Sequence, residues 1–280
     1  MEKLKKKSIQ QIVDSNIRSF AETLSAKHIS ELNNPNGIIN KKRKNVFIEA
    51  LEDDEFIFYS AFVRSFDSSF GNVLENIGNA IANLSFATEK EIDSFLLPAQ
   101  YQKISELKNA YKTDAEHRVE PKIDHYKNFS CIIPGNIESY KRIHKTDHCF
   151  FNAKKNEYYI MELKAGGDLD NKKASSEKEE LLKEYFMLKN KIEKDTKKGQ
   201  KLPKINIYFC VAYNKDGENN KWKQAAVQSC FADKEIIVGK KYWNFVCNDK
   251  KGFDIVLKQY KESAKYIKKA LQDIKSAYSK

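Results

Sequence analysis

The sequence has few of the residues that mark secreted, fibrous or disordered proteins. It holds five cysteines, five prolines and ten glycines among 280 residues. The cysteines are odd in number and none has the close spacing of a redox or zinc motif, so we expect reduced, mostly buried thiols. Aromatic residues make up 12% of the chain, which gives it too much apolar material for a disordered protein. We therefore expect a globular protein.

Long apolar runs are also missing. No stretch approaches the roughly 18 apolar residues that cross a membrane. The basic start Met1–Lys7 continues into polar residues, where a secretory signal would have an apolar segment. The sequence thus predicts a cytoplasmic protein without a membrane partner.

Positive charge is in excess, with 50 Lys and Arg against 39 Asp and Glu and a formal net charge of +11. Phosphate backbones are the commonest partners of basic proteins, so this balance favours nucleic acid. A solvated, lysine-rich surface would carry the same charge. Charge alone leaves both interpretations open.

The pattern of apolar residues predicts helices at both ends of the chain and a sheet between them. Helices are expected around residues 9–24, at 46–64 and from Ser69, and a long amphipathic helix from Phe253 would pack on the core or on a second subunit. Ser176 and Glu179 form a capping box that predicts a further helix start.

Short β-branched and aromatic runs predict strands at 145–152, 157–165 and 205–213. We expect an α/β protein with a central mixed sheet flanked by helices. A helical N-terminal part would span 1–66, and a core of 67–280 would end in the long C-terminal helix, the two forming one compact unit.

The first two strands would form a hairpin with a polar turn at residues 154–155. If the turn is centred there, Asp147 lies directly opposite Glu162. Opposed residues project from the same face of a sheet with Cβ atoms roughly 5 Å apart. Lys164 shares that face, while Leu163 points the other way into the core.

Two opposed carboxylates are unfavourable, because like charges destabilise a sheet unless a cation lies between them. Their presence therefore suggests a bound cation. Mg²⁺ is commonly held by one or two carboxylates with water and phosphate. Lys164 would position the attacking water, with a pKa lowered by partial burial. The alternative is a simple ion pair on an exposed hairpin. Gly166-Gly167 favour the functional interpretation, since they allow a close approach.

These residues resemble a known signature. Thr146-Asp147, fourteen intervening residues and Glu162-Leu163-Lys164 are similar to the active site of the PD-(D/E)xK nucleases, with Thr in place of the usual Pro. The segments 64–75, 162–173 and 238–245 resemble the TdeIII family of type II restriction endonucleases. The resemblance implies Mg²⁺-dependent cleavage of double-stranded DNA by a homodimer, leaving 5′-phosphate ends.

The resemblance also implies a restriction-modification system, in which a cognate methyltransferase acts on the same DNA site, and GGNCC is the site associated with the family. It maps Asp147 and Glu162 onto the metal ligands, Lys164 onto the catalytic lysine and the Leu163 carbonyl onto a further ligand. Glu75 would support the metal site from its helix, an ordinary surface glutamate being the alternative.

Contacts with DNA are harder to locate, because each candidate is as easily a solvated surface residue. Guanine is best bound by Arg or Lys in the major groove, and lysines near a helix start contact phosphate. The candidates for DNA contact are Arg118, Arg142, Lys172, Lys173, Lys223 and Gln224.

Two other functions remain open. One is a repair or recombination nuclease of the same fold that recognises DNA structure instead of sequence. The other is a DNA-binding protein without catalysis, for which the excess of positive charge alone would suffice. Such a protein would be expected to lack one of Asp147, Glu162 and Lys164, whereas this sequence has all three. Cleavage of plain duplex at fixed positions distinguishes the restriction enzyme from both.

Overall fold

The computed structural model describes residues 1–32, 34–37, 40–41, 44–112, 116–197 and 199–278. The chain divides into two compact units, one formed by Met1–Ile81 with Lys251–Lys280 and the other by Ala82–Lys250. This division differs from the expected boundary after residue 66, because one continuous helix runs through that point. The C-terminal helix also packs on the N-terminal one.

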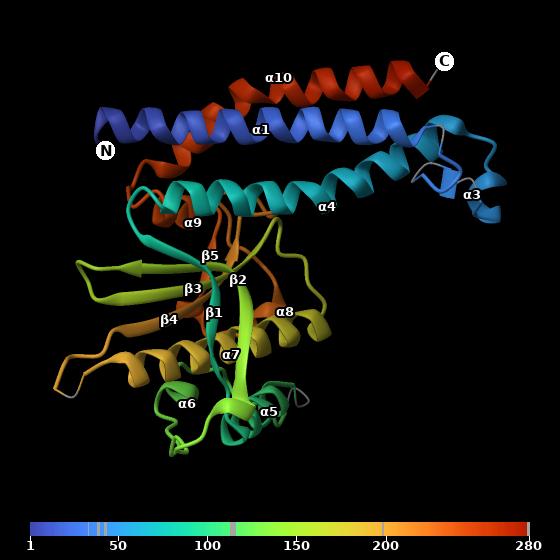
Figure 1. Cartoon of the computed structure of the whole chain (residues 1–280). Helices are drawn as coiled ribbons and strands as arrows, with labels where there is room; N and C mark the ends of the chain where they lie inside the picture. Colours follow the sequence, from blue (N-terminus) through green and yellow to red (C-terminus); the bar gives the residue numbers. More distant parts are fainter. Residues whose placement is uncertain (33, 38–39, 42–43, 113–115, 198, 279–280) are drawn as a thin grey trace. The chain divides into compact units, whose positions relative to one another are not determined.

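The first unit is helical. Its helices are α1 (Lys3–Glu31), α3 (Val46–Glu49), α4 (Asp54–Ala82) and α10 (Gly252–Tyr278). α1 and α10 run alongside each other (Figure 1). The predicted stripe of α1 is buried, as shown by Ile9, Val13, Ile17, Phe20 and Leu24.

The predicted helices at 46–64 and from Ser69 were placed incorrectly. Only one turn forms at Val46–Glu49, and α4 begins after Asp53, whose carboxylate accepts from the Phe56 N–H at 2.9 Å. No break follows Arg64, because Phe66 continues the apolar face and stacks on Phe70 at 5.1 Å between ring centroids.

The second unit is built on a mixed sheet, as predicted, but the sheet has five strands where the sequence predicted three. In spatial order it contains β1 (Ala87–Phe95), β2 (Lys141–Asn152), β3 (Glu157–Lys164), β4 (Lys204–Val211) and β5 (Ile236–Val238). The pairs β1–β2 and β2–β3 are antiparallel, whereas β3–β4 and β4–β5 are parallel. β1 was not predicted, because its first half is polar and largely exposed.

Helices cover both faces of this sheet. α7 (Asn171–Asp195) lies along one face (Figure 1), where it shares a core with β1–β4 and with α5 (Pro98–Lys112). The short helices α6 (Asp124–Lys127) and α8 (Ala225–Gln228) border the same core. On the other face, Phe245 of α9 (Lys240–Val246) packs edge to face on Tyr159 at 4.9 Å between centroids.

α7 begins earlier than the sequence pattern indicated. Asp170 caps the helix by accepting a hydrogen bond from the Lys173 N–H at 2.8 Å. The predicted capping box of Ser176 and Glu179 is therefore wrong, since both residues lie inside the helix. The first three helical residues are polar and exposed, so the apolar pattern begins only at Ala174, although Asp is a strong N-cap.

A buried ion pair fixes α7 to the rest of the unit. The Lys178 ammonium lies 2.8 and 2.7 Å from the two carboxylate oxygens of Glu235. The Tyr126 hydroxyl and the Ala232 N–H also donate to this carboxylate, each at 2.8 Å. Burial lowers the pKa of Lys178, which the Glu235 charge opposes.

Breaking this pair should destabilise the unit strongly. Lys178→Met leaves the Glu235 carboxylate buried without its cation, and such a loss costs about 3 to 5 kcal/mol. Urea denaturation measures the difference. The control is Lys191→Met on the same helix, whose half-exposed pair with Glu89 contributes less than about 1 kcal/mol. Equal losses in the two variants would contradict the anchoring role of Lys178.

Candidate active site

The β2–β3 hairpin has the predicted register. Its ladder ends with His148 opposite Met161, so the next opposed positions are Asp147 and Glu162. There the strands no longer exchange backbone hydrogen bonds, and the Asp147 Oδ2 accepts from the Leu163 N–H at 2.9 Å. The Leu163 side chain is buried, as expected for the opposite face. The two carboxylates therefore share the end of the hairpin.

A bulge in β2 adds a second group to this face. The pairing of β1 with β2 shifts between Glu89 and Glu91, opposite residues 146–148. In a regular strand His144 and Asp147, three residues apart, would face opposite sides. Instead the His144 Nε2 lies 3.1 Å from Glu184 of α7, whose pKa responds to the charge of Asp147. The bulge thus turns both residues toward α7.

Lys164 lies between two carboxylates. Its Nζ is 2.5 Å from Glu162 Oε1 and 2.9 Å from Glu177 Oε1. The exposed fractions of the side chains are 29% for Lys164, 14% for Glu162 and 20% for Glu177. The alternative interpretation, an ion pair on an exposed hairpin, therefore does not describe this group. Glu177 comes from α7 and was not predicted.

Helix periodicity offered the one sequence signal for the residues that the prediction missed. Glu177 and Glu184 are seven residues apart, so they lie on one helix face about two turns apart. Both face the sheet, where they contact Lys164 and His144. Periodicity alone does not tell which face of the helix packs on the sheet, so it singles out neither glutamate.

Burial and crowding of like charges dominate the electrostatics. Burial, followed by the Asp147 charge, raises the pKa of Glu162 to about 9. Burial also raises the pKa of Asp147. For Lys164, burial lowers the pKa, but the charges and hydrogen bonds of Glu162 and Glu177 outweigh it and raise the pKa above its ordinary value. The lowered Lys164 pKa that we expected is therefore wrong, because burial is accompanied by two carboxylate partners.

The two glycines after Lys164 lie close to neighbouring side chains, and Gly167 also has a backbone conformation that favours glycine. A Cβ on Gly166 would lie 2.5 Å from the Tyr213 Oη. Gly167 has φ +70°, and a Cβ there would lie 2.9 Å from Val211 and 3.0 Å from Trp222. The close approach that the sequence predicted is thus made by side chains at the end of β4 and in the segment after it.

Other predicted site residues lie in several places. Glu75 belongs to α4 of the first unit, whereas the carboxylate cluster is in the second. Arg118 is exposed between α5 and α6. Arg142 is exposed on β2, and its guanidinium lies 5.3 Å from the centroid of the Tyr101 ring. Their roles stay predictions.

The candidate lysines lie on segments that follow β3 and β4, the strands next to the carboxylate pair. Lys172 and Lys173 are exposed in the first turn of α7, which follows β3. Lys223 is exposed, while the neighbouring Gln224 is buried and donates to Asp168 at 3.3 Å. This contact ties the segment after β4 to the segment after β3, so these residues share the end of the sheet that carries Lys164.

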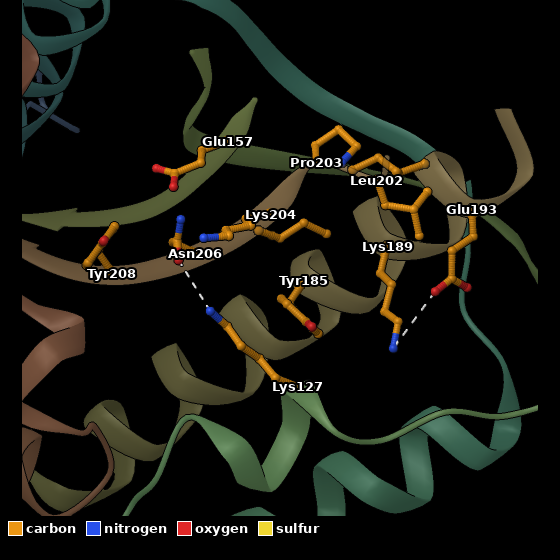
Figure 2. Close-up of a pocket in the computed structure, with 12 residues that line it drawn as sticks. Lys127, Glu157, Tyr185, Lys189, Glu193, Leu202, Pro203, Lys204, Asn206 and Tyr208 are labelled. Atoms are coloured by element: carbon orange, nitrogen blue, oxygen red, sulfur yellow. Dashed lines mark hydrogen bonds and ion pairs between the residues drawn. The ribbon is translucent and has the colours of Figure 1, made fainter. Parts of the chain in front are cut away.

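A cavity of about 700 Å³ lies at the opposite end of the sheet, where β3 and β4 begin (Figure 2). Several of its charged residues have protein partners. Lys127 donates to Asn206 at 3.3 Å, and Lys189 donates to the carbonyl of Phe129 at 2.8 Å. The cavity includes none of the carboxylate cluster, so it is separate from the candidate site.

The donor set constrains which metal the cluster can hold. Among the described residues, no three His, Cys, Asp or Glu side chains are arranged to bind a metal ion. Asp147 and Glu162 would supply only two carboxylates, which leaves the other positions to water, backbone or substrate. Mg²⁺ suits this set, since it keeps several waters and uses one or two carboxylates. Separately, none of the described helices has the length and apolar character to span a bilayer.

The second unit has a mixed sheet flanked by helices, and Asp147, Glu162 and Lys164 lie where its third strand ends. This arrangement defines an α/β protein of the restriction endonuclease type. A family model described as type II restriction endonuclease, HinfI, matches residues 5–264. The chain therefore belongs to the HinfI family of type II restriction endonucleases, and membership implies a deoxyribonuclease that binds DNA. This match does not show the finer resemblance to the TdeIII family. Comparisons with curated proteins and with solved structures gave no match.

The raised pKa of Glu162 makes a prediction for stability. The pKa of Glu162 is raised to about 9 from an ordinary value of 4.5, so the crowded pair of Asp147 and Glu162 holds a proton that the unfolded chain has released. The folded state binds more protons between these values, so stability falls as the pH rises. The slope contributed by Glu162 is at most about 1.4 kcal/mol per pH unit.

Melting temperatures in EDTA at several pH values between 5 and 9 test this. Glu162→Gln, which cannot ionise, should lose less stability than the wild type as the pH rises. Glu193→Gln, a half-exposed glutamate of α7, serves as the control and should follow the wild type. Parallel curves for all three proteins would show that Glu162 does not titrate in this range.

Proposed function

We propose that the chain is a Mg²⁺-dependent type II restriction endonuclease that hydrolyses double-stranded DNA at a specific site. The products would carry 5′-phosphate and 3′-hydroxyl ends. The observation that supports this most is the convergence of Asp147, Glu162 and Lys164 at the end of one hairpin, in a chain that belongs to the HinfI family.

Asp147, Glu162 and the backbone carbonyl of Leu163 are the proposed metal ligands. Mg²⁺ bound there would polarise the scissile phosphate and acidify a water molecule. The Leu163 N–H donates to Asp147, and the N–H and C=O of one strand residue point to the same side. The Leu163 carbonyl is therefore directed toward the same edge of the strand as Asp147, which supports its place in the ligand set.

Lys164 is the proposed catalytic lysine. Its ammonium is held by Glu162 and Glu177 and stays charged, so it can orient the attacking water and stabilise negative charge on the phosphate. The water oxygen bonds to phosphorus, the bond from phosphorus to the 3′ oxygen breaks, and that oxygen takes up a proton. The reaction thus consumes one water molecule and leaves a 5′-phosphate and a 3′-hydroxyl end.

DNA would approach the end of the sheet that carries Lys164. Ligands of open α/β sheets bind beyond the carboxyl ends of the parallel strands, where Lys172, Lys173 and Lys223 are exposed. We propose phosphate contacts for these lysines. A supporting role for Glu75, and base contacts by Arg118, Arg142 or Gln224, are proposals that rest on the sequence alone.

The proposal extends to the biological unit. A homodimer would match its two-fold axis to a palindromic site. GGNCC as that site rests only on the resemblance to the TdeIII family. A cognate methyltransferase would protect the host DNA at the same site, and a cytoplasmic location would place the enzyme where invading DNA arrives.

Digestion of unmethylated phage DNA tests the proposed activity. With Mg²⁺ the purified protein should give discrete fragments whose ends share one short motif, and EDTA should prevent cutting. Lys164→Ala should bind DNA but leave it intact, because the water and the phosphate lose their cation. Undiminished cleavage by this variant would overturn the role of Lys164.

Other digestion products would favour the alternative functions. Ends without a common motif, together with faster cutting of branched DNA, would indicate a structure-selective nuclease. Intact DNA under all conditions, with binding retained, would indicate a protein that binds DNA without cleaving it.

The metal role of Asp147 makes a separate prediction. Asp147→Asn keeps the size of the side chain and an oxygen that can accept from the Leu163 N–H, but it removes the negative charge. We expect Mg²⁺-dependent cleavage to fall by orders of magnitude, measured as single-turnover rates over a range of Mg²⁺ concentrations. Asp168→Asn is the control, since that exposed carboxylate pairs with Lys215. Wild-type rates at low Mg²⁺ would exclude Asp147 as a ligand.

A further inference from the structure

Glu177 reaches Lys164 from outside the sequence motif. Its Oε1 lies 2.9 Å from the Lys164 Nζ, and the two side chains are 20% and 29% exposed. Exposed ion pairs hold their geometry weakly, because water and salt screen them. This pair is largely shielded from solvent, so the contact restrains where the ammonium lies.

The position of Glu177 is itself firmly fixed. The next residue, Lys178, is buried and bonded to both carboxylate oxygens of Glu235. The helix start is capped by Asp170, which accepts from the Lys173 N–H. A carboxylate attached to such a helix is a stable reference point for a flexible lysine, whose four-carbon chain has many rotamers.

The other partner of Lys164 has two competing roles. Glu162 pairs with Lys164, and it also faces Asp147 across the hairpin as a proposed metal ligand. A cation held by Glu162 would compete with the lysine for the same carboxylate. Glu177 contacts the lysine, and the described side chains form no set of three acids, histidines or cysteines that could hold a metal.

We propose that Glu177 is a positioning residue, which holds the Lys164 ammonium in its catalytic orientation while Glu162 serves the metal ion. This inference rests on the proposed function and adds to it the helix that supports the lysine. It predicts that Glu177 affects the rate of the chemical step and leaves DNA binding unchanged.

Single-turnover cleavage at saturating Mg²⁺ tests the inference, once the cleavage site is known. Glu177→Gln keeps the shape of the side chain and removes its charge, and it should lower the rate by about 10- to 100-fold, as is typical when an orienting partner is lost. The Kd for DNA, measured in EDTA, should stay within about twofold of the wild type. Glu177→Asp restores the charge and should recover part of the rate.

Glu179→Gln is the matched control. Glu179 lies on the same helix, its side chain is similarly shielded at 23% exposed, and it pairs with Lys183 at 2.9 Å. It also pairs with Lys108. Loss of this charge should leave the cleavage rate near that of the wild type, with melting temperatures recorded for every variant.

Three outcomes would overturn the inference. The first is a wild-type rate for Glu177→Gln while Lys164→Ala is inactive, which refutes Glu177 and leaves the proposed function intact. The second is an equal loss in Glu179→Gln, which would show a general effect on the helix. The third is full recovery of Glu177→Gln when Mg²⁺ is raised above the concentration that saturates the wild type, which would assign Glu177 to metal binding. Failure of the wild type to cut any DNA would instead refute the proposed function.

Discussion

The opposition of Asp147 and Glu162 at the end of the β2–β3 hairpin is the constraint on which the site depends. Two carboxylates removed from water repel each other, and burial raises the pKa of both. The fold offsets part of this cost with the Leu163 N–H and the Lys164 ammonium. What remains is an acidic site that binds either a proton or a cation, which is the electrostatic basis of the proposed metal dependence.

α7 connects the stability of the second unit with its chemistry. One helix carries the buried Lys178 that anchors it and, at the adjacent position, the Glu177 that contacts Lys164. Two turns after Glu177, Glu184 contacts His144 beside the bulge in β2. The same helix therefore carries contacts to both sides of the candidate site.

Local patterns predicted the elements whose signal lies within one segment. Side chains alternate with a period of two, so a single assumed turn fixed the whole register of the hairpin and the faces of Glu162, Leu163 and Lys164. The apolar stripe of α1 was equally clear. β1 was missed because its polar first half shows no alternation, and the start of α7 was misplaced because Asp170 is followed by three polar, exposed residues.

The sequence by itself determined the class of fold, the hairpin with its three charged residues, and the two glycines after Lys164. Only the tertiary structure decided that Glu177 contacts Lys164, that a bulge turns His144 toward α7, and that the Lys164 pKa is raised. The physical reason is that periodicity reports which face of an element is buried. It does not report which residue of a distant element packs against that face, and charge pairing depends on that contact.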